Sequence, residues 1–160
     1  MVYCARLFTR IIIYAIIACM NNKELTILGA SLYVCEGTKV RRDYRGENRY
    51  IYSIELTNSD PNIIKSFSLF LRKIIKPDWK RVRGQLFLYP DLNEEKLKLV
   101  WSKASGVPLI QFQKSICLKQ KISKFKPNPL GTFKIRYACK EDFLKLQNMI
   151  GIMLKDAGLV

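Results

Sequence analysis

The sequence predicts an α+β fold in which an antiparallel sheet is covered on one face by helices. Segments with strand-like alternation are separated by segments with helical periodicity, and the alternating segments carry arginine or lysine on one side. Hydrophobic residues make up 49% of the 160 residues, which is enough for one domain with a core of its own. We expect that domain over residues 23–156, preceded by an apolar segment of uncertain role, residues 1–22.

The helices follow from apolar periodicity and from capping residues at their ends. Asp60 and Pro61 supply an N-cap and a proline at the first helical position, and Asn93 and Gly106 bracket a later helix. Helices are predicted over residues 23–36, 61–76, 94–105 and 141–156. Strands are predicted, from β-branched and aromatic residues, over 50–57, 80–89, 109–118 and 131–139. Residues 38–49 are expected to form a further strand and a hairpin loop.

The first helix ends on Glu36, and Gly37 follows directly. A helix C-terminus carries partial negative charge, so a carboxylate there is disfavoured by about 0.3–1 kcal/mol unless a cation lies nearby. Gly37 is expected to end the helix in the left-handed conformation. A bound divalent cation would relieve the unfavourable charge. The alternative is an ion pair between Glu36 and Lys39 or Arg41.

Basic residues dominate the chain, with a formal net charge of +15, and no acidic residue occurs between Lys96 and Lys140. This excess indicates a polyanionic partner, with nucleic acid ahead of an anionic membrane surface. Basic side chains on strands are held at fixed positions, from which they can contact the phosphates of a nucleic acid. A two-stranded ribbon fits the major groove of DNA. The alternative explanation of these basic residues is that they lie on ordinary strand faces exposed to solvent, with no role in binding. The candidate DNA-binding residues are Lys39, Arg41, Arg42, Arg45, Arg49, Arg81, Arg83, Gln85, Lys119, Lys121, Lys124, Lys126, Lys134 and Arg136.

The sequence contains no histidine, which excludes histidine-based acid–base catalysis, histidine metal ligands and nucleophilic dyads that need one. The five cysteines have no close-paired spacing, so neither a zinc site nor a disulfide framework is indicated. Free thiols in a reducing cytoplasm are expected. The groups that remain available for catalysis or ligand binding are carboxylates, lysines and hydroxyls.

The N-terminal segment contains an apolar run over residues 11–20, which is too short to span a bilayer. We expect an extra N-terminal helix or a misplaced start codon, and no membrane association. The four residues 16–19 resemble a bacterial lipoprotein cleavage site, so a lipoprotein anchored at Cys19 is the alternative.

Residues 28–37 resemble the signature helix of LAGLIDADG-type homing endonucleases, in the divergent form of small archaeal and bacterial proteins. Small residues occupy the first turns, aliphatic residues follow, and the helix closes on Glu36, Gly37 and the hydroxyl residue Thr38. Family members run helix, two strands, helix, two strands, helix, and the predicted order here is similar. The resemblance covers about residues 23–150, with residues 90–130 resembling an insertion of strand, helix and strand.

The resemblance implies a half domain of that family, with Glu36 as the catalytic acid and Glu36 and Gly37 as ligands of Mg²⁺ or Mn²⁺. It implies a homodimer in which two copies of the helix Leu28–Gly37 pack side by side and bring the two acids together. The implied function is metal-dependent hydrolysis of double-stranded DNA by an endonuclease. The implied dimer interface consists of Gly29, Ala30, Ser31 and Leu32.

One position departs from the family pattern. The first acidic residue of the family's signature falls on Val34. A non-catalytic DNA-binding or transcription-regulatory protein on the same fold is therefore the alternative function.

Overall fold

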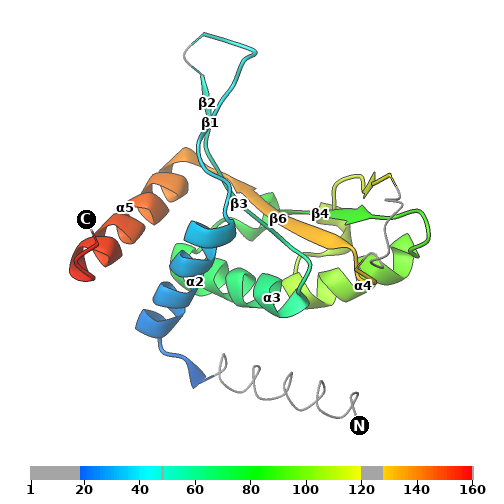
Figure 1. The fold of residues 1–160 in the computed structure, drawn as a ribbon, viewed down its shortest axis with the longest axis horizontal. Helices are drawn as coiled ribbons and strands as arrows, with labels where there is room; N and C mark the ends of the chain where they lie inside the picture. Colours follow the sequence, from blue (N-terminus) through cyan, green and yellow to red (C-terminus); the bar gives the residue numbers. More distant parts are fainter. Residues whose placement is uncertain (1–18, 48, 120–127, 160) are drawn as a thin grey trace.

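The computed structural model describes residues 19–119, apart from residue 48, and residues 128–159. The predicted mixed α+β class is confirmed: a layer of helices lies along a four-stranded sheet, and a thin hairpin projects away from the helices (Figure 1). In chain order the elements are α2 (Asn22–Glu36), β1 (Arg41–Arg42), β2 (Tyr50–Ile51), β3 (Ser53–Asn58), α3 (Pro61–Phe70), a π-helical turn (Leu71–Ile75), a 3-10 turn (Trp79–Arg81), β4 (Arg83–Leu88), α4 (Glu94–Ser105), a second 3-10 turn (Leu109–Gln111), β5 (Ile116–Cys117), β6 (Thr132–Ala138) and α5 (Lys140–Asp156).

The sheet has the strand order β3-β6-β4-β5. β6 pairs antiparallel with β3 on one side and with β4 on the other, whereas β5 pairs parallel with β4. The expectation of an all-antiparallel sheet is therefore wrong for β5. After β4 the chain passes through α4 and comes back beside β4, on the side away from β6. A connection of this kind, which contains a helix, joins parallel strands. In place of the strand predicted over 109–118, the structure has a 3-10 turn, a single bridge between Phe112 and Gly84, and the two residues of β5.

α3 and α4 begin where Asp60 and Asn93 predicted them, whereas the cap of α2 was not predicted from the sequence. Asn21 forms a capping box with Glu24 at the start of α2, and Asp60 caps α3 by accepting from the Asn62 backbone N–H at 2.8 Å. Asn93 caps α4, which ends at Gly106 in the left-handed conformation (φ 66°). These local signals determine the ends of the helices because each one satisfies backbone groups that the helix leaves without partners.

The core lies between the sheet and helices α2, α3 and α4. The side chains of Tyr33, Phe67 and Phe133 are fully buried there. Trp101 of α4 stacks on Phe133 with ring centroids 5.2 Å apart, and its indole N–H donates to the Leu130 carbonyl at 2.8 Å. The segment that resembles an insertion thus supplies one of the largest buried side chains of the described chain.

Gly37 does not adopt the left-handed conformation predicted for it. Its backbone is extended (φ −77°, ψ 148°), because the chain passes directly from α2 into pairing with β3. Gly37 forms a bridge with Leu56, and the Thr38 N–H donates to the Glu55 carbonyl at 3.0 Å. A glycine is needed here because a Cβ atom would collide with the ring and the carbonyl oxygen of Tyr33.

Gly29 lies inside the subunit, where a Cβ atom would collide with the ring of Phe70. Gly29→Ala should therefore lower the free energy of unfolding by about 1–3 kcal/mol, the usual effect of overpacking, despite alanine's better helix propensity. Urea denaturation measures the change.

Gly151→Ala in α5 is the matched control, since nothing lies within 4 Å of a Cβ there. This variant should be stabilised by up to about 1 kcal/mol. Equal stabilisation of the two variants would contradict the packing of Phe70 on Gly29.

Candidate nucleic-acid interface

Basic and polar side chains line the face of the sheet that lies opposite the helices, here called the open face. Arg136 of β6 stands directly across from Glu55 of β3 and from Arg83 of β4. Lys134 in turn stands across from Thr57 and Gln85. Residues directly opposite in neighbouring strands project from the same face, so these side chains form two rows across three strands. The alternation predicted for β4 and β6 is confirmed.

Glu55 lies at the centre of these cations and is 2% exposed. Its Oε1 atom accepts from the Ser53 hydroxyl at 2.6 Å and from Arg41 Nη2 at 3.2 Å. The same atom forms an ion pair with Arg136, whose Nε atom lies 3.1 Å away. Its Oε2 atom lies 4.0 Å from Lys134 Nζ. Removing one partner of a buried ion pair typically costs about 3–5 kcal/mol, because the other charge is left uncompensated. Glu55, itself on β3, therefore connects Arg41 of β1 with Lys134 and Arg136 of β6.

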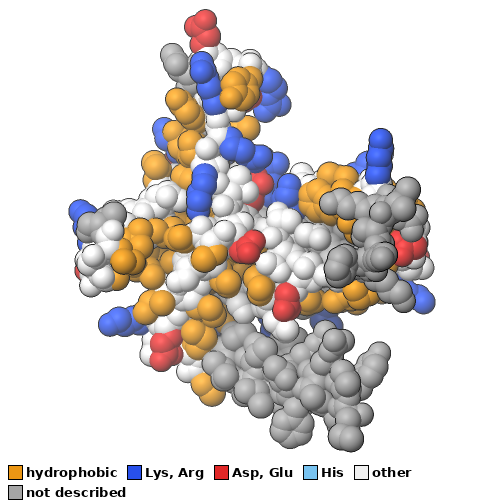
Figure 2. Space-filling model, in the orientation of Figure 1, with side chains coloured by type: hydrophobic (Ala, Val, Ile, Leu, Met, Phe, Trp, Pro, Cys, Tyr) orange, Lys and Arg blue, Asp and Glu red, His pale blue; other side chains and the backbone are white. Residues whose placement is uncertain are grey.

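The β1–β2 hairpin carries the second group of cations. The Asp43 N–H donates to the Arg49 carbonyl at 2.8 Å, and the Arg45 guanidinium binds both carboxylate oxygens of Asp43, at 2.9 and 3.3 Å. These contacts with Arg45 hold the pKa of Asp43 below its usual value. Tyr44 is 89% exposed at the tip, with the Arg42 guanidinium 5.9 Å from its ring centroid. Figure 2 shows Lys and Arg side chains gathered along this hairpin and at its base.

Several predicted contact residues are engaged within the chain. Arg81 precedes β4 and donates to the Ala138 carbonyl at 2.8 Å. Gln85 donates its side-chain amide to the Lys114 carbonyl at 3.2 Å, which attaches the chain ahead of β5 to the sheet. Lys119 is exposed after β5. The remaining predicted loop cations, Lys121, Lys124 and Lys126, lie outside the described residues.

Lys39 provides the positive charge at the C-terminus of α2. Its ammonium group donates to the carbonyls of Tyr33 at 3.3 Å and of Val34 at 3.0 Å. The helix end is thus neutralised by a lysine bound to backbone carbonyls, which was not among the sequence-based alternatives. Arg41, the other expected partner of Glu36, binds Glu55. Among the described residues, Glu36 makes no ion pair or side-chain hydrogen bond, and its side chain is exposed.

The exposed face of α2 differs from the predicted dimer interface. Gly29 and Ala30 are buried within the subunit, Leu32 packs partly against the core, and Ser31 is exposed. The exposed side of α2 includes Ser31 together with Ile27, which is 47% exposed, and Val34, which is 42% exposed.

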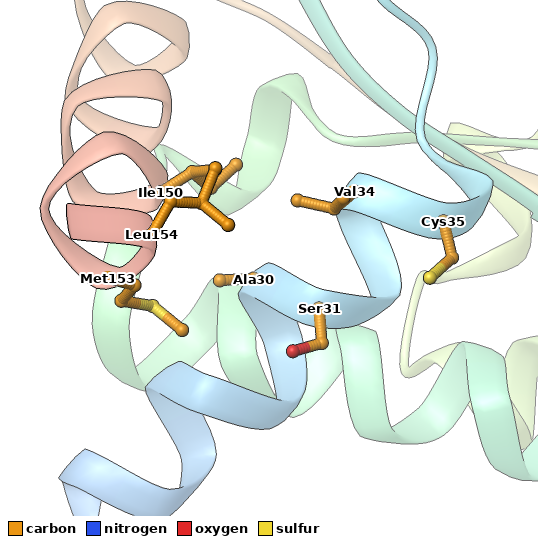
Figure 3. Close-up of a pocket in the computed structure, with 7 residues that line it drawn as sticks. All are labelled: Ala30, Ser31, Val34, Cys35, Ile150, Met153 and Leu154. Carbon is orange, nitrogen blue, oxygen red and sulfur yellow. The ribbon is translucent and has the colours of Figure 1, made fainter. Parts of the chain in front are cut away.

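Beside this side of α2 lies a shallow apolar pocket between α2 and α5. Figure 3 shows Ala30 and Val34 of α2 directed toward Ile150, Met153 and Leu154 of α5. A dimer through α2 stays a prediction, and the face available to it is this one.

A single chain offers few metal ligands. In the described part of the molecule, no group of three or more Asp, Glu or Cys side chains is close enough to hold a metal ion. Glu36 supplies one carboxylate at the end of α2. Mg²⁺ is commonly bound through one or two carboxylates together with substrate phosphates and waters. The Glu36 carboxylate would therefore need phosphate and water ligands beside it to hold such an ion.

No protein family model, curated protein or solved structure matches this chain. No helix within the described residues is long and apolar enough to cross a membrane.

Sequence reasoning missed Glu55. The signal that could have found it is the alternation of Ser53, Glu55 and Thr57 with buried Ile54 and Leu56, which puts a lone acid on the basic face. Its partners could not be read from the sequence, since Arg41, Lys134 and Arg136 lie on other strands.

Burial, and then the negative charge of Glu55, raise the pKa of Tyr33 to about 12 from its usual 10. The unfolded chain therefore loses this proton between pH 10 and 12 while the folded protein keeps it, so this contribution to stability is complete below pH 10 and disappears as pH rises to 12. In the folded protein the Tyr33 hydroxyl donates to the Thr38 carbonyl.

Tyr33→Phe should accordingly show a shallower loss of unfolding free energy between pH 10 and 12 than the wild-type protein. Urea denaturation of both proteins at each pH measures this. Parallel curves would contradict a buried, protonated Tyr33.

Proposed function

We propose that this protein binds double-stranded DNA with the open face of its sheet and its β1–β2 hairpin, on a LAGLIDADG-like half-domain scaffold. The observation that carries the proposal is the placement of Arg83, Lys134 and Arg136 in cross-strand rows on the face opposite the helical layer. Fixed cations on a sheet suit the regular spacing of phosphates along a duplex.

The hairpin supports a duplex partner. It is a narrow two-stranded ribbon that projects from the rest of the molecule (Figure 1). Arg42 ends β1, and Arg45 and Arg49 lie in the segment that joins β1 to β2. The major groove admits a two-stranded ribbon, so the hairpin can enter it while the open face of the sheet lies over the duplex.

A homodimer through the exposed face of α2 is part of the proposal. The exposed apolar residues Ile27 and Val34, with Ser31 between them, would face their symmetry mates. A twofold axis along α2 would bring the two Glu36 side chains toward each other and double the length of the basic surface.

A metal-dependent endonuclease is the second candidate function, and Glu36 favours it, because its side chain is exposed and makes no ion pair with the residues that the structure describes. Glu36 and the Gly37 carbonyl of both subunits would hold Mg²⁺ or Mn²⁺. Such a metal supplies charge stabilisation and an activated water for phosphodiester hydrolysis. A non-catalytic DNA-binding or regulatory protein uses the same surface without needing Glu36, and Val34 at the family's first acidic position favours that alternative.

The double variant Arg42→Gln/Lys134→Gln should weaken binding to a random-sequence duplex and reduce the slope of log affinity against log salt concentration by about 2, because each lost phosphate contact contributes about 0.9. Fluorescence anisotropy at several salt concentrations measures both quantities.

The matched control is Lys73→Gln/Lys155→Gln, which removes the same charge from the exposed surface of the helical elements. This control should leave the slope nearly unchanged. Equal effects in the two double variants would refute binding on the open face and hairpin.

Plasmid cleavage separates the two functions. If the protein is an endonuclease, it should linearise plasmid DNA with Mg²⁺ or Mn²⁺, and Glu36→Gln should abolish cleavage while leaving duplex binding nearly intact. Asp156→Asn, which neutralises the terminal acid of α5, is the control and should cut normally. A wild-type protein that binds the duplex without cutting it is the result expected for the non-catalytic alternative.

A further inference from the structure

The buried carboxylate of Glu55 is an unexpected group on a surface that attracts phosphates. It cancels one positive charge at the centre of the open face, where Arg41, Lys134 and Arg136 converge. Attraction of a polyanion depends on the number of cations and little on their orientation. An acid at this place lowers that attraction, so its presence points to a requirement for orientation.

Glu55 orients Arg136 in one particular way. Its Oε1 atom forms an ion pair with Arg136 at the Nε atom, 3.1 Å away, and no hydrogen bond within the described residues uses the two terminal Nη atoms. The Arg136 side chain is 37% exposed, so part of it is accessible from the open face. An arginine held by Nε presents its two Nη donors as a fixed fork.

Guanine offers the matching acceptors. Its O6 and N7 atoms face the major groove and are bound by the two donors of one guanidinium group, which is the commonest specific contact to a base. A phosphate can be bound by a cation that swings freely, whereas bidentate recognition of a base edge requires a fixed donor pair.

We propose that Arg136 reads a guanine in the major groove and that Glu55 is its positioning residue. This inference rests on the proposed function, because it assigns sequence readout to one point of the proposed DNA-binding surface. Arg41 and Lys134, which Glu55 also holds, contact the backbone on either side of that base pair.

The test begins with a duplex selected from a random-sequence pool by the wild-type protein. Dissociation constants are then measured for the selected duplex, for single-site replacements of each G·C pair by A·T, and for a non-specific duplex. Wild-type protein should prefer guanine at one base pair by about tenfold or more. Glu55→Gln should lose most of that preference while its affinity for the non-specific duplex stays equal or rises, because the surface gains a positive charge.

Arg136→Lys should lose the preference at the same base pair and keep the charge, and it tests the inference even if Glu55→Gln folds poorly. Glu95→Gln on α4 is the control, since it removes an equal charge from an exposed site on the helical side. It should keep the guanine preference.

Three outcomes would overturn the inference. Glu55→Gln could gain affinity equally for every duplex, which would make Glu55 a charge without a positioning role. Arg136→Lys could leave the guanine preference intact, or wild-type protein could bind duplexes with no sequence preference; in both cases the proposed DNA binding would stand. Absence of duplex binding by the wild-type protein would instead refute the proposed function itself.

Discussion

The contacts of the Glu55 carboxylate connect the side chains of the β1–β2 hairpin with those of the open face. β1 and β2 are two residues long and pair only with each other as strands, so Arg41 reaches the main sheet through this carboxylate. Arg136 and Arg83 stand opposite one another, and like charges in that relation repel. A buried acid on the neighbouring strand offsets the repulsion and fixes the direction of Arg136. The arrangement of the open face therefore depends on one side chain that cannot leave water without its partners.

The sheet separates two physical requirements onto its two faces. On one face, apolar residues such as Phe133 pack with the helices and supply the stability of the domain. On the other, cations remain half-exposed, which a core could not tolerate. Because both sets alternate along the same strands, the positions of the cations are as rigid as the core beneath them. A rigid cationic surface is what the proposed recognition of a duplex needs, and a flexible basic tail would not provide it.

The C-terminus of α2 shows how local reasoning and tertiary contacts can differ. A glycine after a helix usually indicates a left-handed turn, but Gly37 is extended because the chain continues directly into pairing with Leu56. The charge conflict at Glu36 was identified correctly from the sequence, yet Lys39 resolves it by binding backbone carbonyls, so no metal is needed for the helix to end there. Glu36 is consequently left exposed and available for a partner subunit or a ligand.

The sequence by itself determined the helices, the longer strands and the sides of β4 and β6 that carry cations, because capping and periodicity act over a few neighbouring residues. It also determined the cationic character of the surface. Only the tertiary structure decided the parallel pairing of β5, the burial of Gly29 against Phe70 and the convergence on Glu55. These features join residues that are far apart in the chain. They depend on the register between strands, which determines the residues that pair across the sheet and cannot be read from local sequence pattern.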